Sequence, residues 1–589
     1  MLGELAAAVT RIAELEAALA GERERAEAAA AERDRLREAY RQVKLELELL
    51  RRRLFVAKAE RIDAAQLELE FADKLATLDE LNRQLGLSTA PESTNTTTEG
   101  GAGDGTGANS PRAVRRTRTG RRELRDVDLP EVRIEVRDPL EGAAPPMCWE
   151  ESSRVVWRRG GSVRLVVARA KYREVDEPAE DVAPADRDEA TIAPMVRIHT
   201  VPMPPAILPR SIAGASLLAH IVSEKFCDGL PFNRQADRFA REGIPIDRGS
   251  MSRWAEELGA IVGSSVVEAM RNEALRTAFC IATDATGLLV QPIKGGEQQR
   301  RGCRRGHFFV QIADADHVFF EYVPRETSAA VGELFRGFSG YVQADAKSVY
   351  DLLFKPPGER PPGDDEPDLA ERHEVGCWSH CRRKLWETAI TTKSPVAREG
   401  LLRVKRIFDL DRSWRGRPAA EIKAQRDLHL RPHTDAFFAW VAVEYDRVKD
   451  QRGMLRSALG YAHRQRGPLT RFFDDGRLQL TNNHAERELR RVAVGRKAWL
   501  FVGSDDHAQA AGNLLTLIAS ARLHGLDPEA YLRDLFCVLP QWPRDRYLEL
   551  APRYWRATRA RLDSRQLELE VAWFTIPPPL PPSEQPAPG

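Results

Sequence analysis

Residues 279–290 read FCIATDATGLLV, an apolar run interrupted by one acidic residue, Asp284. The composition of this run predicts a β-strand. An acidic side chain inside an apolar strand costs free energy unless it is paired or binds a cation. Asp284 is therefore a candidate metal ligand, with a turn-forming role as the alternative.

Two further strands are predicted at residues 306–312 and 317–323, followed by a helix at 328–338. Residues 340–345 then predict a short strand that ends in Asp345. Three strands, a helix and a strand ending in a carboxylate is the order of a ribonuclease H-like fold. This order places the two aspartates on neighbouring strands, although either could also be a turn-former.

A third acidic residue lies far downstream, in residues 481–501, which read TNNHAERELRRVAVGRKAWLF. Thr481 or Asn482 is a suitable N-cap, so Glu486 is expected near the positive end of a helix, where its ionised form is favoured. The basic residues of this helix are Arg487, Arg490, Arg491, Arg496 and Lys497. A carboxylate beside these cations suits a divalent metal and phosphate. The alternative is a solvated helix with ion pairs at three- and four-residue spacing.

The segment closely resembles the C-terminal signature of the Insertion Sequence 66 family of bacterial transposases. In that signature two asparagines precede Ala-Glu-Arg, and a Gly-Arg-Lys-x-Trp-Leu-Phe block follows; the resemblance extends to both aspartates and to residues 230–235. It implies a DDE-type transposase in which Asp284, Asp345 and Glu486 are catalytic and hold two magnesium or manganese ions. Such an enzyme cleaves DNA at the ends of an insertion sequence and transfers the strand into target DNA.

Two alternatives to the transposase interpretation stay open. One is a related metal-dependent nuclease without strand transfer. The other is a catalytically inactive or domesticated DNA-binding or assembly protein derived from such a transposase. The resemblance also implies accessory proteins of the same element as further partners.

Several segments are candidates for binding DNA. Residues 206–262 predict a helix-turn-helix region, with helices at 216–227, 232–242 and 249–258. In the alternative interpretation these helices only pack together, and Trp254 belongs to the core. The predicted DNA-binding residues are Arg115, Arg116, Arg118, Arg121, Arg122, Arg248, Arg253, Arg382, Arg383, Lys384, Asn482, Asn483, Arg487, Arg490, Arg496 and Lys497.

The N-terminal part is expected to mediate assembly. Residues 5–54 keep one heptad register of mainly apolar residues without proline, so a coiled coil is predicted within residues 1–85, and a homo-oligomer with it. Residues 86–125 are predicted to be a flexible linker that ends in a basic tract. The predicted coiled coil implies a partner helix, whereas the predicted linker implies none.

A small β-rich domain is predicted at residues 126–205, with strands at 132–136, 154–157 and 163–169. Members of the family commonly carry two Cys-x-x-Cys pairs here, but this chain has only Cys148 in the region. One thiolate cannot build a tetrahedral zinc site, so this degenerate module is expected to bind no structural zinc.

The catalytic core is expected to comprise residues 275–355 and 475–525, separated by a helical insertion at 356–474. Cys377 and His380 could bind a metal with His373 or Cys381, or Cys377 could simply pack beside a basic helix. A C-terminal segment (526–576) and a disordered proline-rich tail (577–589) complete a multidomain α+β and α/β protein.

Composition and charge limit the classes of protein to which this chain could belong. The net charge is only +1, so DNA binding must come from local basic groups. Seven cysteines without a regular framework argue against a disulfide scaffold and for a reducing compartment. Since no stretch has the length and apolarity of a membrane span, we expect a cytoplasmic, nucleoid-associated protein.

Overall fold

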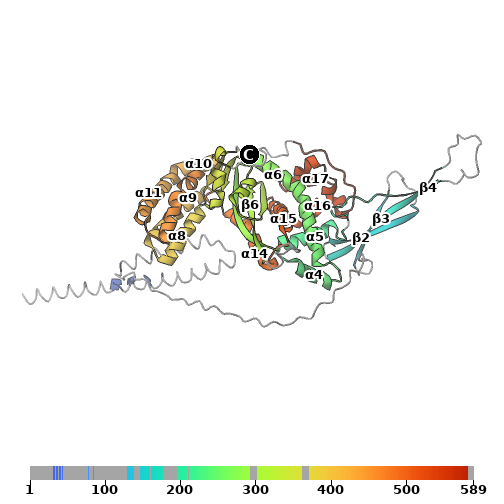
Figure 1. Cartoon of the computed structure of the whole chain (residues 1–589), viewed down its shortest axis with the longest axis horizontal. Helices are drawn as coiled ribbons and strands as arrows, with labels where there is room; N and C mark the ends of the chain where they lie inside the picture. The colour runs from blue at the N-terminus through green and yellow to red at the C-terminus, as the bar shows by residue number, and fades with distance from the viewer. Residues whose placement is uncertain are drawn as a thin grey trace, which may run out of the picture. The chain divides into compact units, whose positions relative to one another are not determined.

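The computed structural model, shown in Figure 1, has two compact units. It describes residues 129–137, 146–158, 161–176, 195–209, 211–291, 302–360 and 370–581, with isolated positions between 21 and 84. The predicted coiled coil, linker and basic tract, including Arg115, Arg116, Arg118, Arg121 and Arg122, lie outside these described stretches. The sheet unit comprises 118–377 and 481–589, and the helical unit contains 378–480. Together they form a mixed α+β protein with two mixed sheets.

The centre of the sheet unit is a five-stranded sheet of order β7-β6-β5-β8-β9. Its strands are β5 (Cys280–Val290), β6 (Arg304–Ala313), β7 (His317–Val323), β8 (Gly340–Gln343) and β9 (Arg372–Val375). The first three are antiparallel, whereas β8 and β9 run parallel to β5. Helix α7 (Ser328–Leu334) connects β7 to β8, as the sequence predicts.

The last strand, β9, differs from expectation. Its residues were assigned to the helical insertion, but they pair with β8, from Gly340 opposite Arg372 to Gln343 opposite Val375. Four residues are too short for a reliable periodic pattern. The sheet therefore continues to Val375, and the helical unit begins only at Trp378.

Helix α15 (Asp505–Leu523) covers the outer edge of β7. The Ser520 hydroxyl accepts a hydrogen bond from the backbone N–H of Val318 (3.0 Å), and the Thr516 hydroxyl accepts one from that of Phe320 (2.9 Å). Gly512 allows this close approach, since an added Cβ would lie 2.5 Å from the Phe320 carbonyl oxygen. The helix thus satisfies polar groups of an otherwise open sheet edge.

The predicted helix-turn-helix region forms α3 (Ala215–Phe226), α4 (Phe232–Arg241) and α5 (Arg248–Val262). Helix α5 packs along α15, as Figure 1 also shows. Its N-cap is Asp247, whose carboxylate accepts hydrogen bonds from the next backbone N–H groups. Trp254 is half-buried against the core, in line with the packing alternative for this residue.

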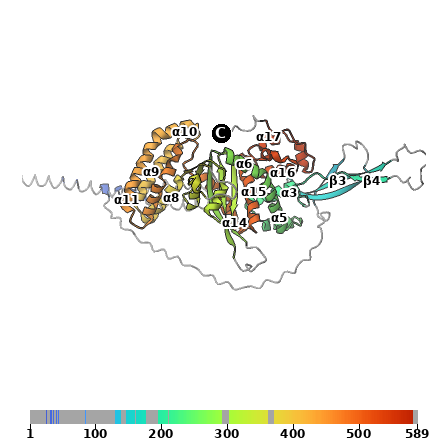
Figure 2. The ribbon, with the colours of Figure 1, turned by 45° about the horizontal axis from the view of Figure 1, so that its top comes forward.

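Four strands form the second sheet, which has the order β1-β3-β2 with β4 also paired to β3. They are β1 (Glu131–Val136), β2 (Cys148–Arg158), β3 (Gly161–Asp176) and β4 (Met195–Thr200). Figure 2 shows β3 and β4 reaching away from helices α3 and α5. Cys148 is exposed at the start of β2.

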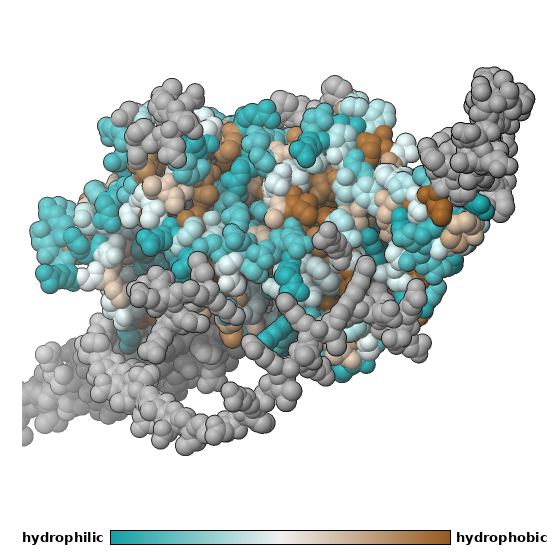
Figure 3. All heavy atoms as spheres, turned by 45° about the vertical axis from the view of Figure 1, so that its right-hand side comes forward, coloured by the Kyte–Doolittle hydropathy of each residue, from teal (hydrophilic) through white to brown (hydrophobic). Residues whose placement is uncertain are grey.

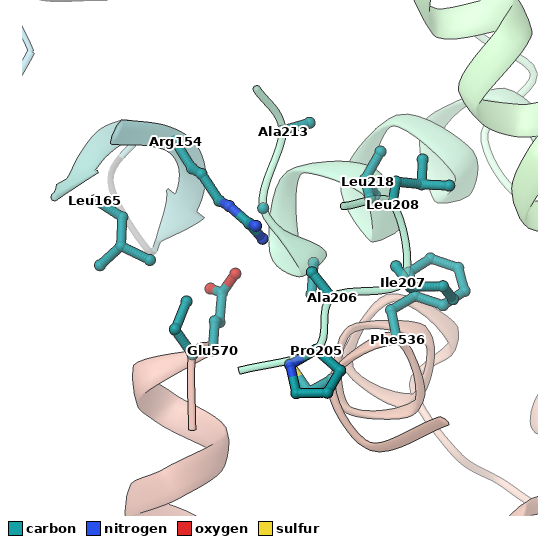
Figure 4. A pocket seen from close by; sticks show the side chains of 14 residues that line it. Arg154, Leu165, Pro205, Ala206, Ile207, Leu208, Ala213, Leu218, Phe536 and Glu570 are labelled. Carbon is teal, nitrogen blue, oxygen red and sulfur yellow. The ribbon is translucent and has the colours of Figure 1, made fainter. Parts of the chain in front are cut away.

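The base of this sheet is fastened to the C-terminal part of the chain. Glu570 is buried, forms an ion pair with Arg158, and accepts a hydrogen bond from the backbone N–H of Ser216 (3.0 Å). Figure 4 shows the Arg154 side chain pointing toward Glu570 across a small pocket. Burial raises the pKa of Glu570, and the charge of Arg158 opposes this shift. These contacts join residues 412 and 354 positions apart in sequence.

The C-terminal helices are α16 (Pro528–Val538), α17 (Trp555–Ala560) and α18 (Ser564–Leu569). The prediction of disorder from residue 577 is wrong for residues 577–581, which the structure describes. Leu580 is buried, and the Arg546 guanidinium donates to the Pro577 carbonyl (2.8 Å). The proline content of this segment predicts a disordered tail. Leu580 and the Pro577 carbonyl nevertheless make specific contacts with the rest of the chain.

The helical unit contains α8 (Trp378–Thr392), α9 (Pro395–Arg412), α10 (Ala419–Gln425), α11 (Arg431–Val448), α12 (Met454–Arg464) and α13 (Arg466–Thr470). Trp378 is fully buried, packs on Phe437 and Phe438, and donates its indole N–H to the Leu469 carbonyl (2.8 Å). The buried Arg426 pairs with Asp411 at 2.8 Å. An aromatic core and a paired charge therefore organise this unit.

Among the described residues no helix is both long and apolar enough to cross a membrane. The face in Figure 3 carries hydrophilic residues with separate hydrophobic areas between them.

A buried network around Glu273 leads us to expect that the stability of the sheet unit depends on pH. Glu273, on α6 (Glu268–Thr277), lies 2.7 Å from Nε2 of His317 and accepts a hydrogen bond from Tyr554. Burial alone would raise the pKa of Glu273, but these partners and Arg553 outweigh it and lower the pKa below its ordinary value of 4.5. Because its pKa is lowered, the ionised Glu273 stabilises the fold fully at pH values above its ordinary pKa. This stabilisation is lost as the pH falls below that value.

We therefore expect Glu273→Gln to lower the free energy of unfolding by about 1–3 kcal/mol near neutral pH. This difference from the wild type should shrink when denaturant titrations are repeated at progressively lower pH through the ordinary pKa. Glu268→Gln, an exposed change on the same helix, is the matched control and should have little effect. A difference that does not vary with pH would contradict the assignment.

Candidate active site

Asp284 lies on β5, and Asp345 lies two residues beyond the end of the neighbouring parallel strand β8, which stops at Gln343 and not at Asp345 as the sequence predicts. In the register of β5 and β8 the last pair is Ala282 opposite Gln343. Asp284 and Asp345 each follow two residues later, so the same register brings them opposite each other. Neighbouring strands are about 4.8 Å apart. The two aspartates that the sequence singles out therefore occupy one end of the paired segment.

Glu486 reaches the same region from helix α14 (Asn483–Trp499), which packs on β5. Asn482 occupies the N-cap position, yet its side chain does not cap the helix. Its amide Nδ2 instead donates to the Thr283 carbonyl at 2.6 Å, one residue before Asp284. Glu486, in the first turn of α14, is thereby tied to the strand that carries Asp284.

The pKa of Asp284 reports this proximity. Burial raises it first, and the negative charges of Asp345 and Glu486 raise it further. The N–H of Ala285 and the ammonium group of Lys347 act in the opposite direction. The region therefore concentrates negative charge that a cation would stabilise.

The oxygen atoms present suit a hard cation. Oδ1 of Asp345 and Oδ1 of Asn482 are both buried and accept no hydrogen bond, while Oδ2 of Asp345 lies 3.4 Å from Nζ of Lys347. Magnesium prefers such oxygen ligands. Within the described stretches, however, no three His, Cys, Asp or Glu side chains are grouped closely enough to form a finished metal site. These oxygen atoms are of the kind that magnesium binds, but the three carboxylates do not form a ligand set among the described residues.

Three predicted DNA-binding residues have other contacts. Asn482 is fully buried and Arg382 nearly so, so neither is available on the surface for phosphates. Arg496 donates to the Thr286 hydroxyl (3.0 Å) and to the Gly287 carbonyl, which fastens α14 to β5. The described contacts of Asn482 and Arg496 lie within the protein, and the DNA contacts of these three residues stay a prediction.

Other predicted DNA-binding residues do face solvent. On α14 these are Arg487, Arg490 and Lys497, with Asn483 half-buried. On α5, Arg248 and Arg253 are exposed near the helix start. In the helical unit Arg383 is exposed, and the ammonium group of Lys384 lies 5.2 Å from the ring centre of Tyr461. The exposed cations of α14 and α5 are available to phosphates.

Two residues near the carboxylates were not predicted. Lys347 follows Asp345 by two positions, a spacing that could have drawn attention to it. Tyr350 is buried, and its pKa is raised well above the ordinary value, first by burial and then by the charge of Asp345. Both contribute to the electrostatics of the site without being acidic.

Cys377 packs against the start of α14. Its sulfur accepts a hydrogen bond from the backbone N–H of Asn482 at 3.3 Å, and the residue is fully buried. Of the two interpretations of this cysteine, the contact favours the packed thiol.

Comparisons with known proteins agree with the placement of these motifs. Residues 210–510, more than half of the chain, match the family described as Transposase IS66 family. Residues 516–553 match the IS66 C-terminal element, and residues 42–134 match Transposase C of IS166 homeodomain.

Similar proteins come from Sinorhizobium fredii (strain NBRC 101917 / NGR234). Uncharacterized protein y4hP is 28% identical over 400 residues, which cover 64% of this chain and 68% of that protein. Uncharacterized protein y4qI is 25% identical over 422 residues, covering 71% and 75%. With its central sheet, its α14 signature and its C-terminal element all matched, the chain belongs to the IS66 family of transposases.

Proposed function

We propose that this protein is a DNA transposase that cuts DNA at the ends of its element and joins the ends to target DNA. The observation that carries the proposal is the proximity of Asp284, on β5, to Asp345, just after β8, and to Glu486 on α14, which packs on β5. The strand order, three antiparallel strands followed by two parallel ones, supports a ribonuclease H-like catalytic domain. Asp284, Asp345 and Glu486 would be the ligands of two magnesium or manganese ions.

Asp284, Asp345 and Glu486 would hold the metal ions through oxygen atoms, and the bound ions would supply an activated nucleophile and stabilise charge on the phosphate. Asn482 fixes the start of α14 against β5. The ammonium group of Lys347, next to Asp345, can balance the charge of the carboxylates before DNA and metal bind. Each chain residue thus positions charge around the phosphate that is cut.

DNA would be held by the exposed cations of α14 and α5, namely Arg487, Arg490, Lys497, Arg248 and Arg253. The match of residues 42–134 to a transposase homeodomain supports additional DNA contact by the N-terminal part. Self-association through the coiled coil would bring two element ends together, in the cytoplasm at the nucleoid. Accessory proteins of the same element would join this assembly.

The test is a cleavage assay with the full chain and labelled duplexes carrying the sequences that flank its gene. With magnesium, we expect nicked or cut ends, and joined products when a target plasmid is added. Cleavage without joining would identify a metal-dependent nuclease. DNA binding without cleavage in magnesium or manganese would identify the inactive assembly protein and overturn the proposal.

A further inference from the structure

The chain makes a rare turn directly after α14. Leu500 has φ +63° and ψ −49°, and the N–H of Phe501 donates to the Trp499 carbonyl at 2.7 Å. These values describe a γ-turn of the strained form, which is uncommon for a residue with a side chain. Strained backbone persists where surrounding contacts hold it, and it is often associated with function.

This turn presents apolar side chains to solvent. Leu500 is 62% exposed and Phe501 is 42% exposed. Leu289 of β5, which is 44% exposed, accepts a backbone hydrogen bond from Val502 at 2.9 Å. We call Leu289, Leu500 and Phe501 the apolar tip. A strained turn that places a leucine and a phenylalanine in water gains nothing for folding, so a binding role explains it better.

The apolar tip is held firmly on both sides. Before the turn, the N–H of Leu500 donates to the Arg496 carbonyl (2.8 Å), and the Arg496 side chain bonds to Thr286. After the turn, the Val502 carbonyl accepts from the N–H of Gln291 (2.9 Å). Strand β5, which also carries Asp284, therefore fixes the tip relative to the candidate active site.

Cations surround the apolar tip. Lys497 lies three residues before Leu500 and is exposed, as is Arg490 two turns earlier on α14. Arg305 of β6 is exposed and lies opposite Leu289 in the strand register. Of the two acidic residues nearby, Asp505 is paired with Arg304, and Asp506 is exposed at the start of α15. An apolar tip flanked by cations matches duplex DNA, which offers an apolar base stack between two rows of phosphates.

We propose that Leu500 and Phe501 form a wedge that enters the base stack of duplex DNA beside the cleavage site. This inference rests on the proposed function, because it assigns the same DNA to the same face. Leu289, the residue of the apolar tip on β5, lies five residues from Asp284, which is about 17 Å along the strand and corresponds to about five base pairs of DNA. Unstacking at this point would bend the DNA and present the phosphate to the carboxylates.

The test uses DNA binding without metal, so that it does not depend on cleavage. The full chain is titrated, in EDTA, into 30-base-pair duplexes that carry 2-aminopurine, either matched or next to a central mismatch. Inserting a wedge costs less free energy at a mismatch than in a matched duplex. We therefore expect mismatched duplexes to bind at least about fivefold more tightly than matched ones. Fluorescence of 2-aminopurine should rise on binding because the base leaves the stack.

Two variants separate the wedge from its surroundings. Leu500→Ser/Phe501→Ser should lose the mismatch preference and the fluorescence increase, while the salt dependence set by phosphate contacts stays as in the wild type. Leu500→Gly relieves the positive φ, so its melting temperature should not fall, yet the mismatch preference should weaken. Leu523→Ser, which changes another leucine with 42% exposure, is the matched control.

Retention of both signals in the Leu500→Ser/Phe501→Ser variant would overturn the wedge. So would bound wild-type protein that leaves 2-aminopurine stacked in every duplex. If the wedge signals appear but magnesium-dependent cleavage does not, the proposed function fails and the wedge stands. If cleavage appears without the wedge signals, the wedge fails and the proposed function stands.

Discussion

Glu486→Gln is expected to reduce magnesium-dependent DNA cleavage by at least about a hundredfold, because even outer partners of metal ligands contribute about 10–100-fold. Glutamine keeps the size of the side chain and its hydrogen-bonding capacity, but it lacks the negative charge that holds a cation. DNA affinity should persist or improve, since removing a carboxylate reduces repulsion of phosphates. Cleavage of labelled duplexes and their binding in EDTA measure the two effects separately.

The same helix offers a matched control. Glu488 lies two residues later and pairs with Arg491 at 3.2 Å. Glu488→Gln makes the identical chemical change without touching the carboxylates around Asp284, so cleavage should stay within a few-fold of wild type. If both variants cleaved equally well with magnesium, Glu486 would be an ordinary helix glutamate and the catalytic assignment would fail.

The sequence could predict the strands that carry the two aspartates because these strands are buried. Asp284 is conspicuous within the apolar β5, and the neighbouring strands β6 and β7 are largely buried, so that the whole sheet has a clear pattern. The helix with Glu486 was recognisable from its N-terminal asparagines and its charged periodicity. Strand β9 was missed, since four residues with one apolar position read equally well as loop.

The roles of individual polar side chains were harder to predict. Arg496 belongs to a row of arginines that looks uniform in sequence, yet the fold turns this one toward β5 and leaves Arg490 in solvent. The position of each arginine around the helix decides whether it faces β5 or solvent. That outcome depends on which face of α14 packs on the sheet. Long side chains also end several ångströms from their backbone, so sequence spacing alone could not separate phosphate contacts from internal ones.

The positive φ of Leu500 had no signal in the sequence. Glycine or asparagine normally marks such a backbone, and here a leucine adopts it. The resemblance to the family marked the Trp-Leu-Phe block without explaining it. Only the backbone geometry shows that these apolar residues are presented to solvent instead of being packed in the core.

Asn482→Ala is expected to raise the magnesium concentration needed for half-maximal cleavage by about 10–100-fold, the range for partners that orient metal ligands. The amide of Asn482 is fully buried and donates to the Thr283 carbonyl at 2.6 Å, so the orientation of its nitrogen is set by that acceptor. Without it, a buried carbonyl next to Asp284 loses its donor, at a cost of about 1–3 kcal/mol in stability.

A stability loss alone would lower cleavage at every magnesium concentration, whereas a positioning role shifts the concentration that is required. Asn482 ties the strand of Asp284 to the start of the helix of Glu486, so its loss should let the carboxylates separate and weaken cation binding. Asn483→Ala, at a half-buried neighbour, is the control and should leave the magnesium requirement unchanged. A magnesium requirement that is the same in Asn482→Ala and wild type would show that this contact stabilises the fold without positioning the carboxylates.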